Sequence, residues 1–376
     1  MHVLIAGGGV GGLCLAQGLR RAGISCAVYE RSPGLTPGGY LLHMNADGGN
    51  GLRACLPDDL YDLYVRTSRP TPRRDVLVIQ NHLGHELAVK PHLGPSNDPV
   101  TPHTTVHRRA LCQIMLHGIE DRVRFGREVV GYRSTADGVT IELDNGELAH
   151  GDVLVAADGI NSAVRRQFLP DVETAVLVRD VLLSRSPLTP AVERALPDAF
   201  QDSFVITVDP AGTLMAAGLF RPRHPFTAEM PVDAVEDYVS VSVEPAAAGI
   251  DIFAASGPEL HDVMRKAVTD WHPGLQQLVD GVLPDTIMPK TTRMVLPTDP
   301  WSPGNVTVLG DAIHAMPPML GDGANSALRD AASLTTALSD AARGYTDLSV
   351  AVGRYEEAMR ARTYPLLREA MTVADA

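Results

Sequence analysis

The chain has 376 residues, which exceeds the usual size of a single compact core and predicts one large domain with a smaller domain inserted in it. Hydrophobic residues make up 45% and charged residues 20% of the sequence, and these proportions exclude a disordered or membrane-embedded chain. The net charge of -13 excludes broad attraction to nucleic acid or anionic lipid, so a small-molecule partner is favoured.

The four cysteines lie apart, without the spacing of metal ligands, and we interpret them as reduced, buried thiols. An apolar strand begins at His2, and no run reaches the ~18 apolar residues of a membrane span. The histidine pairs fall in Pro- and Gly-rich loops, so no metal site is expected. We therefore expect a soluble, cytoplasmic protein, and its oligomeric state stays open.

The first elements in chain order form a βαβ unit. Residues 2–6 (HVLIA) predict a buried strand, residues 10–22 a helix, and residues 25–30 (SCAVYE) a second strand. A helix is expected from Arg108, and strands are expected around residues 127–133, 138–143 and 152–157. These strands would return the chain to the cofactor-binding domain that the βαβ unit begins.

From about residue 170 to 290 the pattern changes. Strand-like runs at 203–208 and 213–220 alternate with amphipathic helices expected near 231–242 and 258–270. A strand at 305–309 then leads into a long helix from about Gly323 and a last helix from about Leu348 to Met371. The expected fold is α/β, a Rossmann-like cofactor-binding domain with an inserted mixed-sheet α+β substrate domain and a long C-terminal helix. The expected boundaries are 1–70, 100–170 and 290–345 for the first domain, 71–99 and 171–289 for the second, and 346–376 for the C-terminal helix.

The first motif is the turn GGGVGG between the first strand and the first helix. Gly7 permits a tight turn, Gly9 lets the backbone approach a pyrophosphate, and Gly12 allows the helix to pack closely on the strand. Glu30 ends the second strand, where its carboxylate can accept the hydroxyls of an adenosine ribose. The alternative is a plain glycine-rich turn. The unit predicts a dinucleotide site but does not separate FAD from NAD.

The second motif is VLGDAIHAMPPMLGDGANSALRDA, residues 308–331. Asp311 follows a strand and can bind the hydroxyls of a ribityl chain. The helix start near Gly323 can face the negative charge of a reduced isoalloxazine. A second ADP site would need neither feature, so the segment favours FAD.

With these residues the chain closely resembles the class A flavoprotein monooxygenases, the para-hydroxybenzoate hydroxylase family. A middle fingerprint of that family is present as DVLVAADGINSAVR, which carries Asp158, Gly159, Ser162 and Arg165. The three fingerprints occur in the family's order, and the similarity spans nearly the whole chain. The residues that match its second FAD fingerprint are Gly310, Asp311, His314, Pro317, Gly321, Gly323, Asn325, Asp330 and Ala331.

The resemblance implies roles for particular residues. Glu30 and Arg31 would hold the adenosine, Arg108 would contact the FAD backbone, Asp158 would support FAD and nicotinamide binding, and Asp311 would hold the ribityl chain. The predicted cofactor-binding set is Gly7, Gly9, Val10, Gly12, Glu30, Arg31, Gly39, Arg108, Asp158, Gly310, Asp311, Gly321, Gly323, Ala324 and Asn325.

Two features depart from the family pattern. Asp322 stands where many relatives carry Gln, and its carboxylate would oppose an anionic reduced flavin unless it turns to solvent. No arginine stands just before Gly38-Gly39, where many relatives place one near the flavin.

The resemblance implies that NADPH, or NADH, reduces FAD and that oxygen bound at the flavin C4a atom is transferred to an aromatic or polycyclic substrate. Hydroxylation is the first expectation, while Baeyer-Villiger insertion and epoxidation would use the same intermediate. An alternative is a non-oxygenating FAD enzyme, such as a reductase, a dehydrogenase or a cyclase-like catalyst. A flavin-dependent halogenase is not favoured, because its W-x-W-x-I-P motif is absent.

Because the cofactor would carry the chemistry, no catalytic triad is expected. His43, Arg221 and Pro317 are candidates for contact with the flavin or the reacting substrate. For the apolar residues, core packing is an equal alternative, and Arg221 could either bind an anionic or phenolic substrate or cap the sheet at the surface. His43 could equally be a satisfied core histidine. The predicted substrate-binding set is Phe204, Met215, Phe220, Arg221, Pro318 and Met319.

Overall fold

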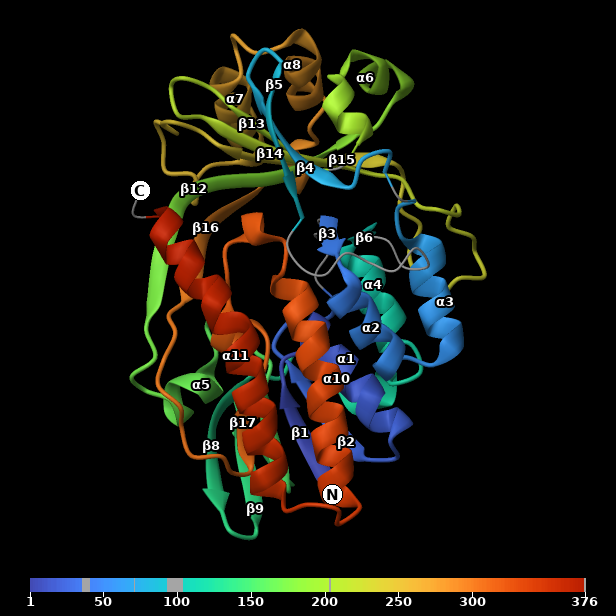
Figure 1. The fold of residues 1–376 in the computed structure, drawn as a ribbon, viewed down its shortest axis with the longest axis vertical. Helices are drawn as coiled ribbons and strands as arrows, with labels where there is room; N and C mark the ends of the chain where they lie inside the picture. Colours follow the sequence, from blue (N-terminus) through green and yellow to red (C-terminus); the bar gives the residue numbers. More distant parts are fainter. Residues whose placement is uncertain (36–40, 71, 93–103, 203, 375–376) are drawn as a thin grey trace.

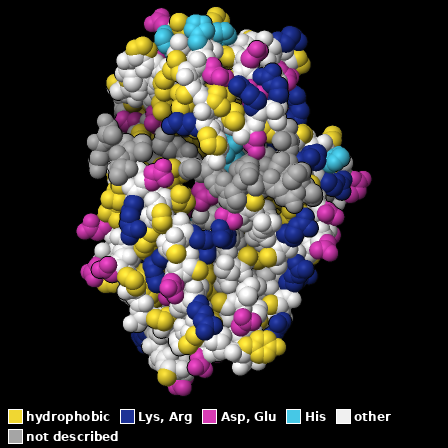
Figure 2. Space-filling view, in the orientation of Figure 1, with side chains coloured by type: hydrophobic (Ala, Val, Ile, Leu, Met, Phe, Trp, Pro, Cys, Tyr) yellow, Lys and Arg dark blue, Asp and Glu magenta, His cyan; other side chains and the backbone are white. Residues whose placement is uncertain are grey.

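The computed structural model describes residues 1–35, 41–70, 72–92, 104–202 and 204–374. Figure 1 shows an elongated molecule, with one sheet and its helices in the lower half and a second sheet with its own helices at the top. On the face seen in Figure 2, acidic and basic side chains are interspersed. Within the described residues, none of the helices has the length and apolar character needed to cross a membrane.

The described strands of the lower half include a five-stranded parallel sheet in the order β17-β11-β1-β2-β7. The expected βαβ unit is confirmed, and its strands are buried because helix α1 packs on one side of the sheet and a small antiparallel sheet, with Val139, Ile141 and Leu143, packs against it as well. Strands from the beginning, middle and end of the chain lie side by side in this sheet. Their bounds are β1 His2–Ala6, β2 Ser25–Glu30, β7 Val123–Phe125, β11 Val153–Ala156 and β17 Val306–Val308.

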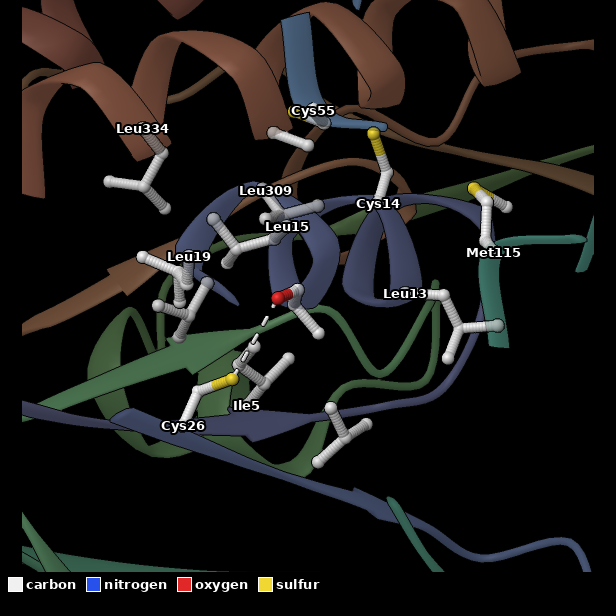
Figure 3. Packing of buried hydrophobic residues seen from close by; sticks show 14 of the residues in the cluster. Ile5, Leu13, Cys14, Leu15, Leu19, Cys26, Cys55, Met115, Leu309 and Leu334 are labelled. Carbon is white, nitrogen blue, oxygen red and sulfur yellow. Dashed lines mark hydrogen bonds between the residues drawn. The ribbon is translucent and has the colours of Figure 1, made fainter. Parts of the chain in front are cut away.

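Helix α1 (Val10–Arg21) packs on the sheet and against three other helices. Figure 3 shows Leu13, Leu15 and Leu19 of α1 in one apolar cluster with Ile5 of β1 and Leu334 of a C-terminal helix. This apolar cluster fixes the direction in which the N-terminus of α1 points. The partner helices are α2 Ala46–Cys55, α4 Arg108–Leu116 and α10 Gly323–Ala342, and α3 Asp58–Thr67 packs on α2 and α4.

Two small antiparallel sheets flank the parallel sheet. One has the order β10-β9-β8 and packs against β1 and β11, and the other pairs β3 with β6. The pair β3–β6 lies between the lower half and the upper sheet (Figure 1). The bounds are β3 Leu41–Met44, β6 Thr104–His107, β8 Val129–Thr135, β9 Gly138–Leu143, β10 Leu148–Gly151, and for the neighbouring helices α5 Ala163–Phe168 and η1 Glu120–Arg122.

The upper sheet has seven described strands in the order β16-β12-β15-β14-β13-β4-β5, with β13 parallel to β4 and the other pairs antiparallel. Its helices cover one face and enclose a second apolar core. The strands are β4 Val76–Asn81, β5 Glu86–Pro91, β12 Thr174–Pro187, β13 Phe204–Val208, β14 Leu214–Phe220, β15 Tyr238–Glu244 and β16 Met288–Val295, and the helices are α6 Pro190–Ala195, η2 Asp198–Gln201, α7 Gly257–Ala267, α8 Pro273–Asp280 and η3 Pro284–Thr286.

One predicted element of this part is wrong. The helix expected near 231–242 is absent from the described structure, and Tyr238–Glu244 form strand β15 instead. The run YVSVSV places Val239, Val241 and Val243 in the core under the helices and the residues between them on the opposite face. This period of two satisfies a strand between β12 and β14.

The C-terminal part returns to the parallel sheet. Two short helices, α9 Asp311–His314 and η4 Pro318–Leu320, precede α10, and α11 (Leu348–Ala374) lies beside α10 in Figure 1. Tyr364 and Leu367 of α11 form a third apolar cluster with Met294 of β16. The two long helices begin where the sequence predicts them, and the expected fold class is confirmed.

Candidate active site

The glycine turn after β1 contains two glycines that the fold requires, Gly7 and Gly12, and one that it does not, Gly9. A β-carbon on Gly7, whose φ is +104°, would lie 2.2 Å from the carbonyl oxygen of Ala157, and one on Gly12 would lie 2.0 Å from that of Gly7. A β-carbon on Gly9, the N-cap of α1 just before Val10, would meet nothing within 4 Å. Gly9 therefore leaves open space above the helix N-terminus, where free N–H groups favour an anion.

Glu30, at the end of β2, folds back over this turn. Its Oε2 accepts a hydrogen bond from the backbone N–H of Gly8 at 2.7 Å, and its Oε1 accepts one from Ser32 at 2.9 Å. Each oxygen keeps further acceptor capacity for a ligand hydroxyl. Arg31 is largely exposed and lies 4.0 Å from Glu128.

The middle motif forms a turn beside the first. Asp158 follows β11, and its Oδ2 accepts from the backbone N–H of Ala163 at 2.9 Å. Its Oδ1 is buried and has no hydrogen-bond partner among the described residues, and burial raises the pKa of this carboxyl group. Ser162 caps α5, and Arg165 donates to the carbonyl oxygen of Ala312 at 2.9 Å. The buried, unpartnered oxygen is a feature expected of a ligand-binding carboxylate.

The third motif is organised by Asp330 from within α10. Its Oδ2 lies 2.6 Å from His314 Nε2 and accepts from the backbone N–H of Gly310 at 3.2 Å, where φ is +60°. Arg362 of α11 donates to Oδ1 at 3.1 Å. Sequence reasoning missed Arg362, because no pattern connects a residue of the last helix to this loop.

Asp311 projects beside this network. Solvent reaches its side chain, yet the surrounding protein raises the pKa of its carboxyl group, with the charges of His314 and Arg108 acting in the opposite direction. Arg108 is the first residue of α4. The structure brings it close enough to Asp311 for its charge to act on that carboxyl group, although the two residues are distant in the sequence.

Asn325 ties the N-terminus of α10 to strand β3. Its Oδ1 accepts from the backbone N–H of Asn45 at 2.9 Å. Its Nδ2 donates to the carbonyl oxygens of His43 and Gly321, both at 2.9 Å. With its side-chain amide engaged in this way, Asn325 positions the loop that ends in Gly321 and the helix start at Gly323 and Ala324.

Asp322 does not turn to solvent, as its expected conflict with a reduced flavin would require. It is only 7% exposed, and it accepts hydrogen bonds from Asn45 Nδ2 at 2.8 Å and from Ser326 Oγ at 2.6 Å. Burial raises the pKa of this carboxyl group, Asp47 adds to that effect, and the two donors oppose it. The carboxylate therefore does not meet the condition of turning to solvent, and these two donors satisfy it inside the protein.

Of the three candidates for chemistry, His43 and Pro317 lie near this helix start. His43, on β3, has Nδ1 3.4 Å from the carbonyl oxygen of Gly321, and its ring lies 4.4 Å from that of His92. Pro317 is buried and Pro318 is exposed at the start of η4. Gly39 and the side chain of Met319 lie outside the described residues.

The substrate candidates separate onto two faces of the upper sheet. Phe204 pairs with Gly218 on the face toward β3, which is the inner face of the upper sheet, since a β-carbon on Gly218 would meet both Phe204 and Leu41. Phe220 shares that face, but Met215 does not, because odd-numbered residues of β14 point into the core under the helices. The prediction that Met215 lines the same pocket is therefore corrected.

Arg221 follows β14 and is held by two carboxylates. Its Nε donates to Asp237 at 2.5 Å, and its two terminal nitrogens each lie 3.1 Å from an oxygen of Glu193. These ion pairs raise the pKa of the guanidinium group. They favour the sheet-capping alternative over substrate binding for this residue.

Comparisons with known proteins agree with this geometry. The FAD binding domain family matches residues 283–369. A crystal structure from Photorhabdus luminescens subsp. laumondii TTO1, provisionally assigned as an FAD containing monooxygenase, superposes with a TM-score of 0.83 at 30% identity and covers 100% of this chain and 97% of that one. The aurachin C monooxygenase/isomerase of Stigmatella aurantiaca is 29% identical over 360 residues, 95% of this chain and 84% of that protein.

A dual O-methyltransferase/FAD-dependent monooxygenase of Cercospora beticola is 31% identical over 401 residues, 96% of this chain and 44% of that protein. The chain thus spans less than half the length of this relative and of two similar curated relatives. The chain belongs to the class A, para-hydroxybenzoate hydroxylase type family of FAD-dependent monooxygenases.

Proposed function

We propose that the protein is an FAD-dependent, NAD(P)H-consuming monooxygenase that hydroxylates an aromatic or polycyclic small molecule with one oxygen atom of O2. The convergence of the three motifs carries this proposal. The open space at Gly9, the unpartnered Oδ1 of Asp158 and the accessible carboxylate of Asp311 come from three distant segments of the chain. They meet around the N-termini of α1 and α10, as the parts of an extended dinucleotide require.

These residues fit FAD. The α1 N-terminus would hold the pyrophosphate, Glu30 the adenosine ribose and Asp311 the ribityl chain, while the start of α10 would face the isoalloxazine. When bound, the flavin supplies the electron transfer and the activation of oxygen.

The tasks left to the protein are positional and electrostatic. The hydrogen bonds of the Asn325 side chain, called the Asn325 clamp, hold the N-terminus of α10, whose free N–H groups stabilise negative charge. The inner face of the upper sheet, with Phe204 and Phe220, would hold an aromatic substrate and exclude water from the reacting atoms.

We further infer NADPH, or NADH, as the donor and a division into an FAD-binding and a substrate-binding domain at the boundaries given above. The four free, buried cysteines support a reducing, cytoplasmic location. The non-oxygenating alternative has no observation in its favour.

An absorbance spectrum of the purified protein, followed by NADPH or NADH addition in air, tests the proposal. We expect bands of oxidised flavin, oxygen consumption stimulated by a member of a phenolic and polycyclic panel, and a product heavier by one oxygen atom. Flavin bands with reduced product but no oxygen incorporation would favour the non-oxygenating alternative. A colourless protein that cannot be reconstituted with FAD would contradict both.

A further inference from the structure

Two buried polar side chains with unused hydrogen-bonding atoms meet on the inner face of the upper sheet. His107 ends strand β6, and Tyr238 begins strand β15, with ring centroids 5.7 Å apart. Phe220 packs against both, at 6.1 Å from His107 and 5.1 Å from Tyr238. The apolar ring of Phe220 therefore packs directly beside the two polar side chains.

The orientation of His107 is fixed by the helix that follows it. Its Nδ1 accepts a hydrogen bond from the backbone N–H of Ala110 at 3.3 Å, as the N-cap of α4. Its Nε2 is buried and has no partner among the described residues. Burial and the charges of Arg185 and Arg109 lower the pKa of His107 to about 4. The ring is thus neutral near pH 7, and Nε2 carries the proton as an unused donor.

Tyr238 presents the second unused group. Its side chain is nearly completely buried, and its hydroxyl has no hydrogen-bond partner within the part of the chain that the structure describes. Burial raises the pKa of the phenol, so the hydroxyl keeps its proton. Buried hydroxyls in native proteins generally have a partner, and its lack points to a group supplied by a ligand.

A cation stands on the same face. Arg185 of β12 pairs with Ser240 of β15, and Pro187 pairs with Tyr238, so Arg185 lies two positions along from Tyr238 on one side of the sheet. Its guanidinium group makes no ion pair or side-chain hydrogen bond with any residue that the structure describes. Arg221, in contrast, is held by two carboxylates.

The carboxylate that acts on the neighbouring His107 is already paired with another arginine. This carboxylate is Asp233, which is paired with Arg109 at 2.7 Å. Two neutral donors and one cation without a carboxylate partner are the complement of an anionic oxygen group. A neutral ligand would accept hydrogen bonds from His107 and Tyr238 but would leave the positive charge of Arg185 without an opposite charge.

We propose that His107, Tyr238 and Arg185 form a subsite that binds an anionic oxygen group, a carboxylate or phenolate, of the aromatic substrate. This proposal rests on the proposed function, because it names the substrate class of the same site. Phe220 packs on the rings that carry the donors and would contact the aromatic part of the ligand.

Calorimetric titration of the FAD-loaded protein with 2-naphthoate and with its neutral analogue 2-naphthamide tests the subsite. We expect 2-naphthoate to bind at least about tenfold more tightly, because a charge-assisted hydrogen bond is stronger than a neutral one. Arg185→Gln should remove most of this preference and change the affinity for 2-naphthamide by less than about twofold, and Arg185→Lys should restore part of it. Tyr238→Phe should weaken 2-naphthoate binding by about threefold or more.

Arg265→Gln is the matched control, since Arg265 lies on α7 across the same sheet and pairs with Asp280. It should leave the preference unchanged. Equal affinities for the two ligands, a preference that survives Arg185→Gln, or no binding of 2-naphthoate to flavin-loaded protein would overturn the subsite. If the Arg185-dependent preference is present but no oxygen is consumed, the subsite stands and the monooxygenase function fails.

Discussion

Gly9 differs from its neighbours Gly7 and Gly12 in what a β-carbon would meet. The fold leaves no room at Gly7 or Gly12, whereas the space at Gly9 is open. Gly9→Ala should therefore keep the unfolding temperature of the FAD-free protein within about 2 °C but weaken FAD binding by about tenfold or more, because the added methyl group occupies the approach to the pyrophosphate.

Fluorescence titration of FAD and thermal unfolding without FAD measure the two effects. Gly49→Ala, at a helical glycine whose β-carbon also meets nothing within 4 Å, is the control and should change neither by much. Unchanged FAD affinity in Gly9→Ala would contradict the pyrophosphate position.

His107 gives the protein an acid-sensitive stability. Its pKa in the folded state is about 4, below the value of about 6.5 in the unfolded chain. As the pH falls through about 6.5 toward 4, the unfolded chain gains a proton that the folded protein does not, so the free energy of unfolding decreases, by up to about 3 kcal/mol from this group at pH 4. Above about pH 6.5 this loss is absent.

His107→Asn keeps an N-cap acceptor and removes the titrating ring. Urea unfolding between pH 7 and pH 4 should show a shallower decline for this variant than for the wild type, whereas His85→Asn, at an exposed loop position, should follow the wild type. Parallel curves for wild type and His107→Asn would show that another group causes the decline.

At the scale of elements, the Asn325 side chain connects α10 to β3. Asn325→Ala would leave the backbone groups of Asn45, His43 and Gly321 without this partner inside the protein. We expect a loss of about 2–4 kcal/mol in the free energy of unfolding, because unsatisfied buried groups keep their desolvation cost.

Ser339→Ala is a control on the same helix, since the Ser339 hydroxyl donates to the carbonyl oxygen of Thr335 in the preceding turn. It should cost less than about 1 kcal/mol in chemical denaturation. Equal losses in the two variants would mean that the clamp contributes nothing beyond ordinary helix contacts.

At the scale of the whole molecule, the site is complete only when three chain segments converge. A ligand that binds the folded protein alone stabilises it, by about 2.7 kcal/mol at a concentration one hundred times its dissociation constant. Removal of FAD should therefore lower Tm, and added FAD should restore it, in differential scanning calorimetry. The Gly9→Ala variant should respond less at the same FAD concentration, and a Tm independent of FAD would contradict the proposed site.

Much of the architecture could be predicted because its signals are local. The buried strands, the glycine turn and the helix starts depend on residues a few positions apart, and the structure has them where the sequence predicts them. The run 231–242 failed, because its alternation only becomes a strand when β12 and β14 pair with it on both sides.

The sequence by itself determined the fold class and the order of the three motifs, since these depend on backbone sterics and hydrophobic period. Only the tertiary structure decided which side chains meet. It buried Asp322 between Asn45 and Ser326, bound Arg221 to carboxylates, and turned Met215 away from the inner face. It also brought Arg185, His107 and Tyr238 together from three distant strands, because sheet register and long-range packing, which no local preference encodes, set the face on which each side chain lies.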